Sequence, residues 1–253
     1  MRKVVDPVSE RAPKNKDEFH LFQLLPNMLT IAAICAGMTA IRVGADGNTV
    51  LATQLILAAA IIDGLDGRLA RMLDADTTMG AELDSLADFL NFGVAPPLVI
   101  YFWALQDMRS LGWIAVLIYG VCCVTRLARF NVGKKSDEPE DDAYFTGVPS
   151  PAGAMMVLLP IFLSFALGSE GPALPDAVIS VYMVGIGLLF IMTLPTWSFK
   201  AAKISRENVK YFLVAFACVG AAFLTYAWIT MVVLCLAYAG VIIWSLTVGR
   251  PAK

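Results

Sequence analysis

Long runs without charged side chains constrain this sequence more than any other feature. Residues 211–247 contain no Asp, Glu, Lys or Arg, and residues 28–41 are equally free of charge. Of all residues, 58% are hydrophobic and 16% are charged, whereas soluble domains carry about 25% charged residues. A transmembrane helix needs about 20 predominantly apolar residues. The sequence therefore predicts a polytopic helical membrane protein and excludes a disordered chain, a coiled coil or an ordinary cytosolic enzyme.

The apolar runs divide into eight predicted membrane spans. They cover residues 27–43, 49–71, 79–105, 111–130, 149–168, 177–195, 209–226 and 229–247. Before them, residues 17–25 have the pattern of a short helix lying on the membrane surface. We expect a single all-α membrane domain over residues 1–253, made of an N-terminal segment 1–25, a helical core 26–210 and two additional spans in 211–253.

The basic residues indicate the orientation of this domain. Eight spans put both termini on the same side of the membrane, and all but two of the 19 Lys and Arg residues then fall on that side. The exceptions are Arg42 and Arg109. Basic loops face the cytoplasm, so both termini are predicted to be cytoplasmic. The net charge of −2 argues against a nucleic-acid partner.

Four aspartates gather where the second and third predicted spans reach the cytoplasmic side. Asp63 and Asp66 are three residues apart and Asp84 and Asp88 are four apart, so each pair shares one helical face. The polar residues 72–78 between the pairs predict a turn, which would bring the two faces together. Carboxylate oxygens suit Mg²⁺, Mn²⁺ or Ca²⁺, and four carboxylates can hold two ions. Hydrated acids at exposed helix ends are the alternative interpretation, and the regular spacing disfavours it.

This acidic segment resembles the signature of the CDP-alcohol phosphatidyltransferases, D-x2-D-G-x2-A-R-x8-G-x3-D-x3-D, at every fixed position from Asp63 to Asp88. The resemblance implies the fold of that family. It also implies that all four aspartates hold one or two divalent ions, Mg²⁺ or Mn²⁺, on the pyrophosphate of a CDP-linked lipid. Asp88 would in addition be the catalytic base that deprotonates an acceptor alcohol, whose attack releases CMP.

The same resemblance assigns residues to the CDP group. Gly67, Ala70 and Gly80 would make room for the cytidine, and Arg71 would order the site electrostatically. The segment Pro26-Asn27-Met28-Leu29-Thr30 is similar to the P-N-x-x-T entry of these enzymes, in which Asn27 and Thr30 contact the nucleotide; a helix start is the alternative interpretation. The family often has asparagine three residues after that threonine, and this chain has Ala33 instead.

Three further segments resemble the phosphatidylserine synthases of the bacterial membrane type. They are CVTRLARFNV at residues 123–132, FTGVPSP at 145–151 and PTWSFK at 195–200. The implied reaction transfers the phosphatidyl group of CDP-diacylglycerol to L-serine. The residues predicted to bind the acceptor or lipid phosphate are Arg126, Arg129, Asn131, Gly147, Pro149, Ser198 and Lys200. For the basic residues, anchoring at the cytoplasmic interface is the alternative.

Two other functions stay open from the sequence. The same chemistry with glycerol phosphate, inositol phosphate or choline as acceptor is the nearer one. A cation transporter is the other, although its acids would be expected near the bilayer midplane and in matched halves of the chain. The resemblance further implies a homodimer in the inner membrane of a bacterium, in contact with membrane lipid and with its active site facing the cytoplasm.

Overall fold

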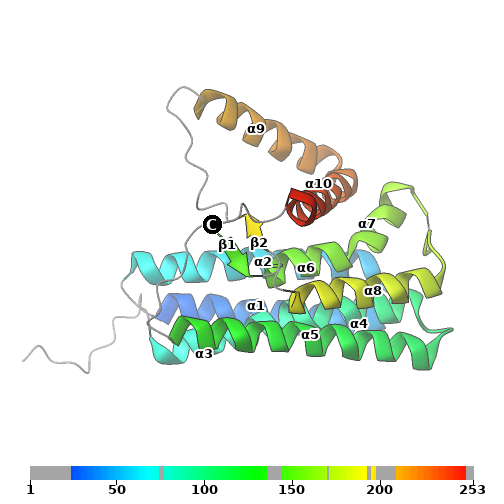
Figure 1. Cartoon of the computed structure of the whole chain (residues 1–253), viewed down its shortest axis with the longest axis horizontal. Coiled ribbons are helices and arrows are strands. Elements are labelled where there is room, and N and C mark those ends of the chain that lie inside the picture. Colours follow the sequence, from blue (N-terminus) through cyan, green and yellow to red (C-terminus); the bar gives the residue numbers. More distant parts are fainter. Residues whose placement is uncertain are drawn as a thin grey trace, which may run out of the picture.

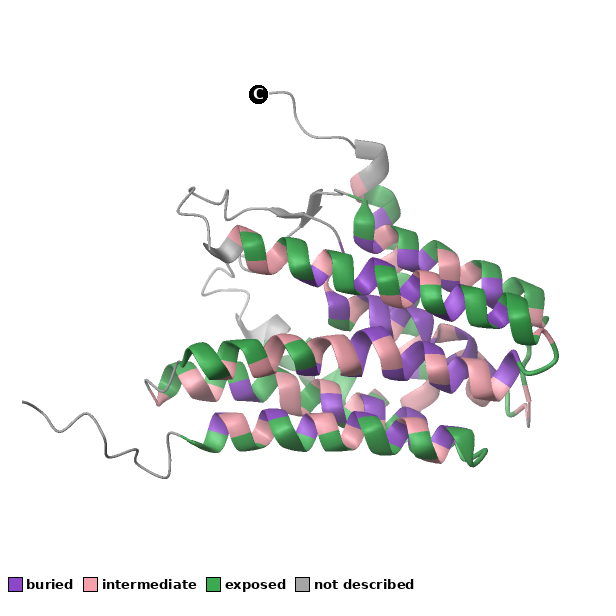
Figure 2. Cartoon of the chain, turned by 90° about the horizontal axis from the view of Figure 1, so that it is seen from below, coloured by how far each residue is buried: buried purple, intermediate pink, exposed green. Residues whose placement is uncertain are grey.

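The computed structural model describes residues 24–73, 77–135, 144–146, 148–169, 171–192, 195–197 and 209–248. Within these ranges, most helices run side by side along the long axis of the molecule, and α9 and α10 lie across one side of this bundle (Figure 1). Most of the bundle helices bury a stripe of residues toward their neighbours and leave the other residues partly or fully exposed (Figure 2). This pattern fits helices that pack together and face lipid on their outer sides.

The first two helices, α1 (Leu25–Ala45) and α2 (Thr49–Met72), form an extensive antiparallel contact. The buried face of α1 is a stripe of mostly small residues that includes Ala33, Gly37 and Ala40. Small side chains let two helix backbones approach closely in a membrane, where lipid removes the usual hydrophobic drive for packing. The turn between the helices contains Gly47 at φ 88°, a left-handed conformation that favours glycine.

The third predicted span is a composite of α3 (Thr78–Asp88), the π-helix η2 (Phe89–Val94) and α4 (Ala95–Ala104). Pro96 and Pro97 lack the N–H groups that would bond to the carbonyls of Phe92 and Gly93 in an α-helix. The hydroxyl of Tyr119 on α5 donates to the Phe92 carbonyl over 3.1 Å. A carbonyl freed by proline is thus satisfied by a neighbouring helix, as hydrocarbon surroundings require.

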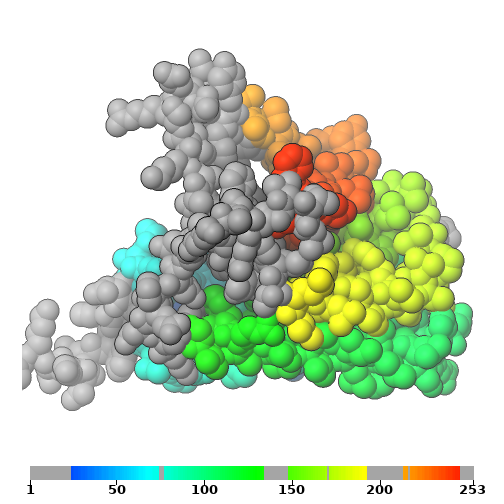
Figure 3. All heavy atoms as spheres, viewed as in Figure 1, coloured from blue at the N-terminus to red at the C-terminus, as the bar shows by residue number. Residues whose placement is uncertain are grey.

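The helices α5 (Arg109–Lys135) and α8 (Asp176–Ile191) pack along one face of the bundle, where Figure 3 shows α5 in green beside α8 in yellow. A Cβ atom on Gly187 of α8 would lie 3.1 Å from the Cα of Tyr119, so glycine is what permits this close approach. The Tyr119 ring meets the ring of Phe190 edge to face, with centroids 5.4 Å apart.

The predicted span 149–168 is broken into α6 (Ser150–Val157) and α7 (Leu159–Ala166), because Pro160 stands just after the junction. The Met156 carbonyl, four residues before Pro160, accepts a 2.6 Å hydrogen bond from the hydroxyl of Tyr182 on α8. This is the second carbonyl opposite a proline that a tyrosine hydroxyl satisfies.

The last two helices are α9 (Val209–Thr225) and α10 (Ala227–Val248), and α10 packs against α7. A short antiparallel strand pair, which the sequence did not predict, joins β1 (Tyr144–Thr146) and β2 (Pro195–Trp197). Its register pairs Tyr144 with Trp197 and Thr146 with Pro195.

Within the described part of the chain, five helical segments are long and apolar enough to cross a membrane, and α8 and Leu213–Thr225 are shorter apolar helices. The chain is therefore a multi-pass helical membrane protein, and the full count of eight spans stays a prediction. Most of the interfacial helix predicted at 17–25 lies outside the described residues, and Leu25 belongs to α1.

The Tyr119 hydroxyl gives a first testable prediction. Tyr119→Phe should lower the free energy of unfolding by about 1–2 kcal/mol, because the Phe92 carbonyl then loses its interhelical donor inside the bundle. Thermal unfolding of the detergent-purified protein would measure the loss. Tyr226→Phe is the matched control, since Tyr226 is 63% exposed. Equal melting temperatures for the two variants would contradict the role given to Tyr119.

Candidate active site

The predicted acidic cluster forms where α2 and α3 meet. Carboxylate oxygens of Asp63, Asp66 and Asp84 all lie within 4.8 Å of one another. Asp88 stands next to this group, and its carboxyl group shares a hydrogen bond with that of Asp63. The structure therefore brings all four predicted aspartates together from two helices.

Asp66 is the most deeply placed of these acids, with 2% of its surface exposed. Its Oδ2 atom accepts a 2.6 Å hydrogen bond from the hydroxyl of Thr30 on α1, which also donates to the Pro26 carbonyl. Thr30, predicted from the resemblance to contact the nucleotide, is itself buried and holds this carboxylate in place. Because Thr30 and Asp66 are 36 positions apart in the sequence, their spacing did not predict this contact.

Other residues predicted for the CDP group flank the acids. Asn27 of α1 packs against Gly80 of α3, where a Cβ atom would come within 2.8 Å of the Asn27 Oδ1 atom. Gly80 thus gives room to Asn27, which the resemblance did not imply. A Cβ atom on Gly67 would meet nothing within 4 Å, so this glycine faces open space. Arg71 folds back along α2 and donates from Nε to the Gly67 carbonyl over 3.1 Å. Ala70, between them, is half-buried.

Arg126 of α5 lies near Asp88, and the two side chains attract each other electrostatically. Its Nη1 atom donates to the hydroxyl of Ser150, the first residue of α6, over 2.5 Å. The guanidinium also lies 5.8 Å from the centroid of the Phe130 ring. A positive charge that is held by Ser150 therefore lies close to Asp88.

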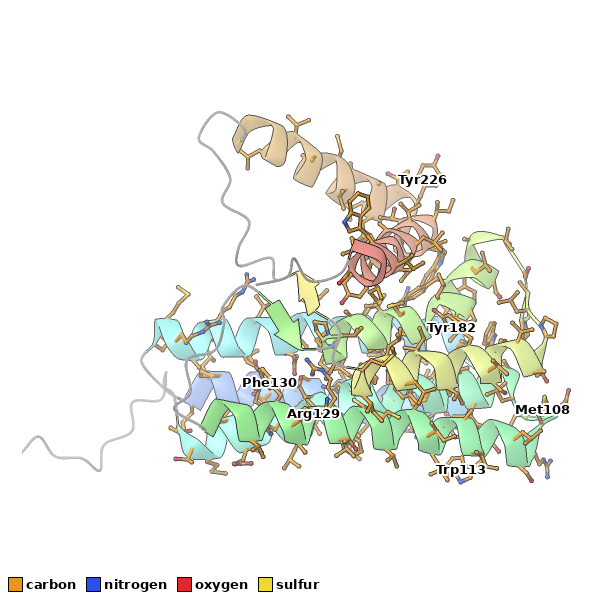
Figure 4. The ribbon with its side chains drawn as sticks, viewed as in Figure 1. Met108, Trp113, Arg129, Phe130, Tyr182 and Tyr226 are labelled. Atoms are coloured by element: carbon orange, nitrogen blue, oxygen red, sulfur yellow. The ribbon has the colours of Figure 1, made fainter. Side chains whose placement is uncertain are left out.

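The remaining acceptor-site predictions have different outcomes. Asn131 donates from Nδ2 to the Ser85 hydroxyl over 3.0 Å, which ties α5 to α3 between Asp84 and Asp88. Arg129 donates to the Ile191 carbonyl at the end of α8 over 3.1 Å, so its described contact is with a helix end rather than with the acids. Figure 4 shows Arg129 and Phe130 in the same stretch of α5, away from Trp113 near its other end and from Met108, which precedes the helix.

Pro149 is the residue just before α6, and its extended backbone precedes the helix that carries Ser150. Gly147, Ser198 and Lys200 lie outside the described residues.

Sequence reasoning did not single out Ser85 and Ser150. Both are single serines without a motif of their own, so their roles depend on partners distant in the sequence, Asn131 and Arg126. For Ser150, the one available signal was its place within the segment FTGVPSP, which as a whole resembles the phosphatidylserine synthases.

The donor set of the acidic cluster fits a hard divalent cation. The Oδ1 atoms of Asp63 and Asp66 are buried and have no hydrogen-bond partner among the described residues. Buried carboxylate oxygens are stable when they are paired with a cation or coordinate a metal. Oxygen-rich sites of this kind suit Mg²⁺ or Mn²⁺.

Comparison with known proteins identifies the family of this chain. The family model described as CDP-alcohol phosphatidyltransferase matches residues 23–193. The CDP-diacylglycerol–serine O-phosphatidyltransferase of Mycobacterium tuberculosis is 39% identical over 220 residues, which cover 85% of this chain and 76% of that protein. The enzyme of the same name from Helicobacter pylori is 33% identical over 194 residues, covering 75% of this chain and 77% of that one.

A solved structure supports the fold. The phosphatidylinositol phosphate synthase of Mycobacterium tuberculosis, crystallised with CDP-DAG bound, superimposes with a TM-score of 0.51 at 21% identity, covering 73% of this chain and 98% of that chain. The matched residues 23–193 contain the four aspartates and both helices that carry them. The chain belongs to the CDP-alcohol phosphatidyltransferase family.

Proposed function

We propose that this protein transfers the phosphatidyl group of CDP-diacylglycerol to the hydroxyl of L-serine, giving phosphatidylserine and CMP. One observation supports the proposal: three clustered carboxylates suited to a cation lie beside Asp88, and the cationic Arg126 lies near Asp88. The relatives from Mycobacterium tuberculosis and Helicobacter pylori, whose printed names specify serine, support the choice of acceptor.

We assign the metal ligands to Asp63, Asp66, Asp84 and Asp88. The pairwise distances, the unpartnered Oδ1 atoms and the open space at Gly67 support this set. One or two bound Mg²⁺ or Mn²⁺ ions would neutralise charge on the pyrophosphate oxygens during displacement. Thr30 orients Asp66 through its hydrogen bond, so its contribution to nucleotide binding is made through that carboxylate.

The nucleotide side of the site is assigned to α1, α2 and the start of α3. Gly67 and Ala70 leave space beside the acids, and Arg71 supplies a positive charge at the same turn of α2. Asn27 and Gly80, in contact with each other, close this side between α1 and α3. Cytidine would therefore lie against small residues, where its ring can approach the helix backbone closely.

Asp88 is proposed to act as the general base. Its carboxylate takes the proton of the serine hydroxyl, the serine oxygen forms a bond to the lipid-side phosphorus, and the phosphorus–oxygen bond to CMP breaks. Arg126 lies on the acceptor side of Asp88 and can pair with the serine carboxylate. We also assign Arg129, Asn131, Gly147, Pro149, Ser198 and Lys200 to the acceptor or lipid phosphate. The hydrogen bond from Asn131 to Ser85, which lies between Asp84 and Asp88 in the sequence, supports this assignment for Asn131.

The membrane setting follows from the charge distribution. We propose an inner-membrane protein of eight spans with both termini and the active site on the cytoplasmic side, because nearly all basic residues fall there. Residues 26–210 would form the catalytic core, with 211–253 adding two spans to the same domain. Diacylglycerol chains would reach the site from the surrounding lipid. Association into a homodimer is proposed on the resemblance to the family.

A panel of acceptors tests the function. Purified protein with labelled CDP-diacylglycerol and Mg²⁺ or Mn²⁺ should release CMP and form labelled phosphatidylserine with L-serine. Glycerol phosphate, inositol phosphate and choline should give little product. Removal of divalent ions with a chelator should abolish transfer, and adding them back should restore it. A clear preference for another acceptor, or transfer that survives chelation, would contradict the proposal.

Asp88→Asn tests the base. General bases contribute about 10²–10⁴-fold to rates, so we expect CMP release to fall by at least about 100-fold. The loss should persist at high Mn²⁺, whereas part of the loss in Asp66→Asn should be recovered by added metal. Asp107→Asn is the control, because Asp107 is exposed beyond the end of α4, outside the acidic cluster. A normal rate of CMP release in Asp88→Asn would make the mechanism wrong.

Arg126→Gln tests whether Arg126 binds serine or CDP-diacylglycerol. If Arg126 pairs with the serine carboxylate, its loss should raise the KM for serine by about tenfold or more. The KM for CDP-diacylglycerol should change little. Arg109→Gln, at the opposite end of α5, serves as the control. Equal increases in both KM values would place Arg126 on the lipid phosphate instead.

A further inference from the structure

The C-terminal helix α10 packs against the broken segment α6–α7 with a defined register. The ring of Trp228 contacts those of Phe162 and Phe165, with centroids 6.3 and 4.9 Å apart. Seven residues further along α10, the Cys235 thiol donates to the Met155 carbonyl over 3.5 Å. Residue numbers rise along α10 while they fall along α6–α7, so the helices run antiparallel.

This register directs the next turn of α10 toward the start of α6. Tyr238 follows Cys235 by three residues on the same helical face, and it is half-buried against the core. Ser150, at the start of α6, lies five residues before Met155 and holds Arg126. Consistent with this position, Tyr238 lies close enough to Arg126 for the guanidinium charge to act on its phenol group. Tyr238 therefore comes to the side of Arg126 from a helix far away in the sequence.

Arg126 retains hydrogen-bonding capacity in this arrangement. Its Nη1 atom is used by Ser150, while its Nε atom is buried and without a hydrogen-bond partner among the described residues. A guanidinium carries five donors in a planar fork that suits a carboxylate. A phenol hydroxyl beside it can add one more donor to the same anion. Ser150, Arg126 and Tyr238 together match a small carboxylate-bearing alcohol better than a quaternary ammonium group.

We infer that Tyr238 is a binding residue of the acceptor site, where its hydroxyl and Arg126 bind the carboxylate of the acceptor alcohol. The inference rests on the proposed function and extends it to a helix outside the matched family segment, which ends at residue 193. The catalytic acids lie inside that segment, on α2 and α3. Acceptor choice is thus partly set by an element that the shared family segment does not contain.

Tyr238→Phe tests this inference, because it removes the hydroxyl and keeps the ring that packs against the core. We expect the KM for serine to rise by about tenfold, with kcat and the KM for CDP-diacylglycerol changed less than about twofold. Tyr226→Phe, at the exposed junction of α9 and α10, is the matched control and should leave all three constants unchanged. Melting temperatures of both variants report whether α10 stays docked.

A double-mutant cycle with Arg126→Gln makes the test specific. If both side chains bind the same carboxylate, the double variant should lose less serine affinity than the two single losses combined. An unchanged KM for serine in Tyr238→Phe, or equal increases in both substrate KM values, would overturn the inference while leaving serine transfer by the parent protein intact. Failure of the parent protein to use serine would instead overturn the proposed function.

Discussion

Mutual repulsion among the aspartates of α2 and α3 is the constraint on which the arrangement of this protein depends. At an effective dielectric constant of about 20, two unit negative charges 4.8 Å apart repel each other by about 3 kcal/mol. The close contact of α1 with α2 opposes this repulsion, since it holds α2 in place and brings Thr30 to Asp66. The positive charge of Arg126, near Asp88, also opposes it. A divalent cation bound among the carboxylates would remove most of the remaining repulsion between them.

The π-helix η2 lets the acidic turns and the apolar turns of one long segment face different neighbours. Successive side chains of an α-helix point in directions about 100° apart around the helix axis. The wider turn of η2 shifts this phase, so the side chains of α3 and α4 face different directions from those of one continuous α-helix. Asp84 and Asp88 can then face α2, while Val99 and Ile100 of α4 are fully buried in the core. The prolines after η2 free the Phe92 carbonyl, and Tyr119 satisfies it. In the same way, the hydroxyl of Tyr182 donates to the Met156 carbonyl and stabilises the break between α6 and α7.

The sequence predicted the acidic cluster well because helical spacing and a short turn are local properties. Their spacing along the chain places Asp63 and Asp66 on one helical face and Asp84 and Asp88 on another. The short turn between the helices then brings the two faces together. The π-helix was not predicted, since one extra residue in a turn leaves no trace in an apolar segment. Thr30 was assigned to the nucleotide from a motif, and its contact with Asp66 depends on how α1 crosses α2. Tyr238 belongs to no motif, and its position follows from the register of α10 on α6.

Most of the polar groups that link helices around the site are uncharged. Thr30 bonds to Asp66, Ser85 to Asn131 and Ser150 to Arg126, each through a hydroxyl. A charged linker at any of these places would alter the electrostatic potential at the carboxylates, whereas a hydroxyl orients its partner with little effect on net charge. The charge of the site is therefore set by the aspartates and Arg126, and its geometry by neutral side chains.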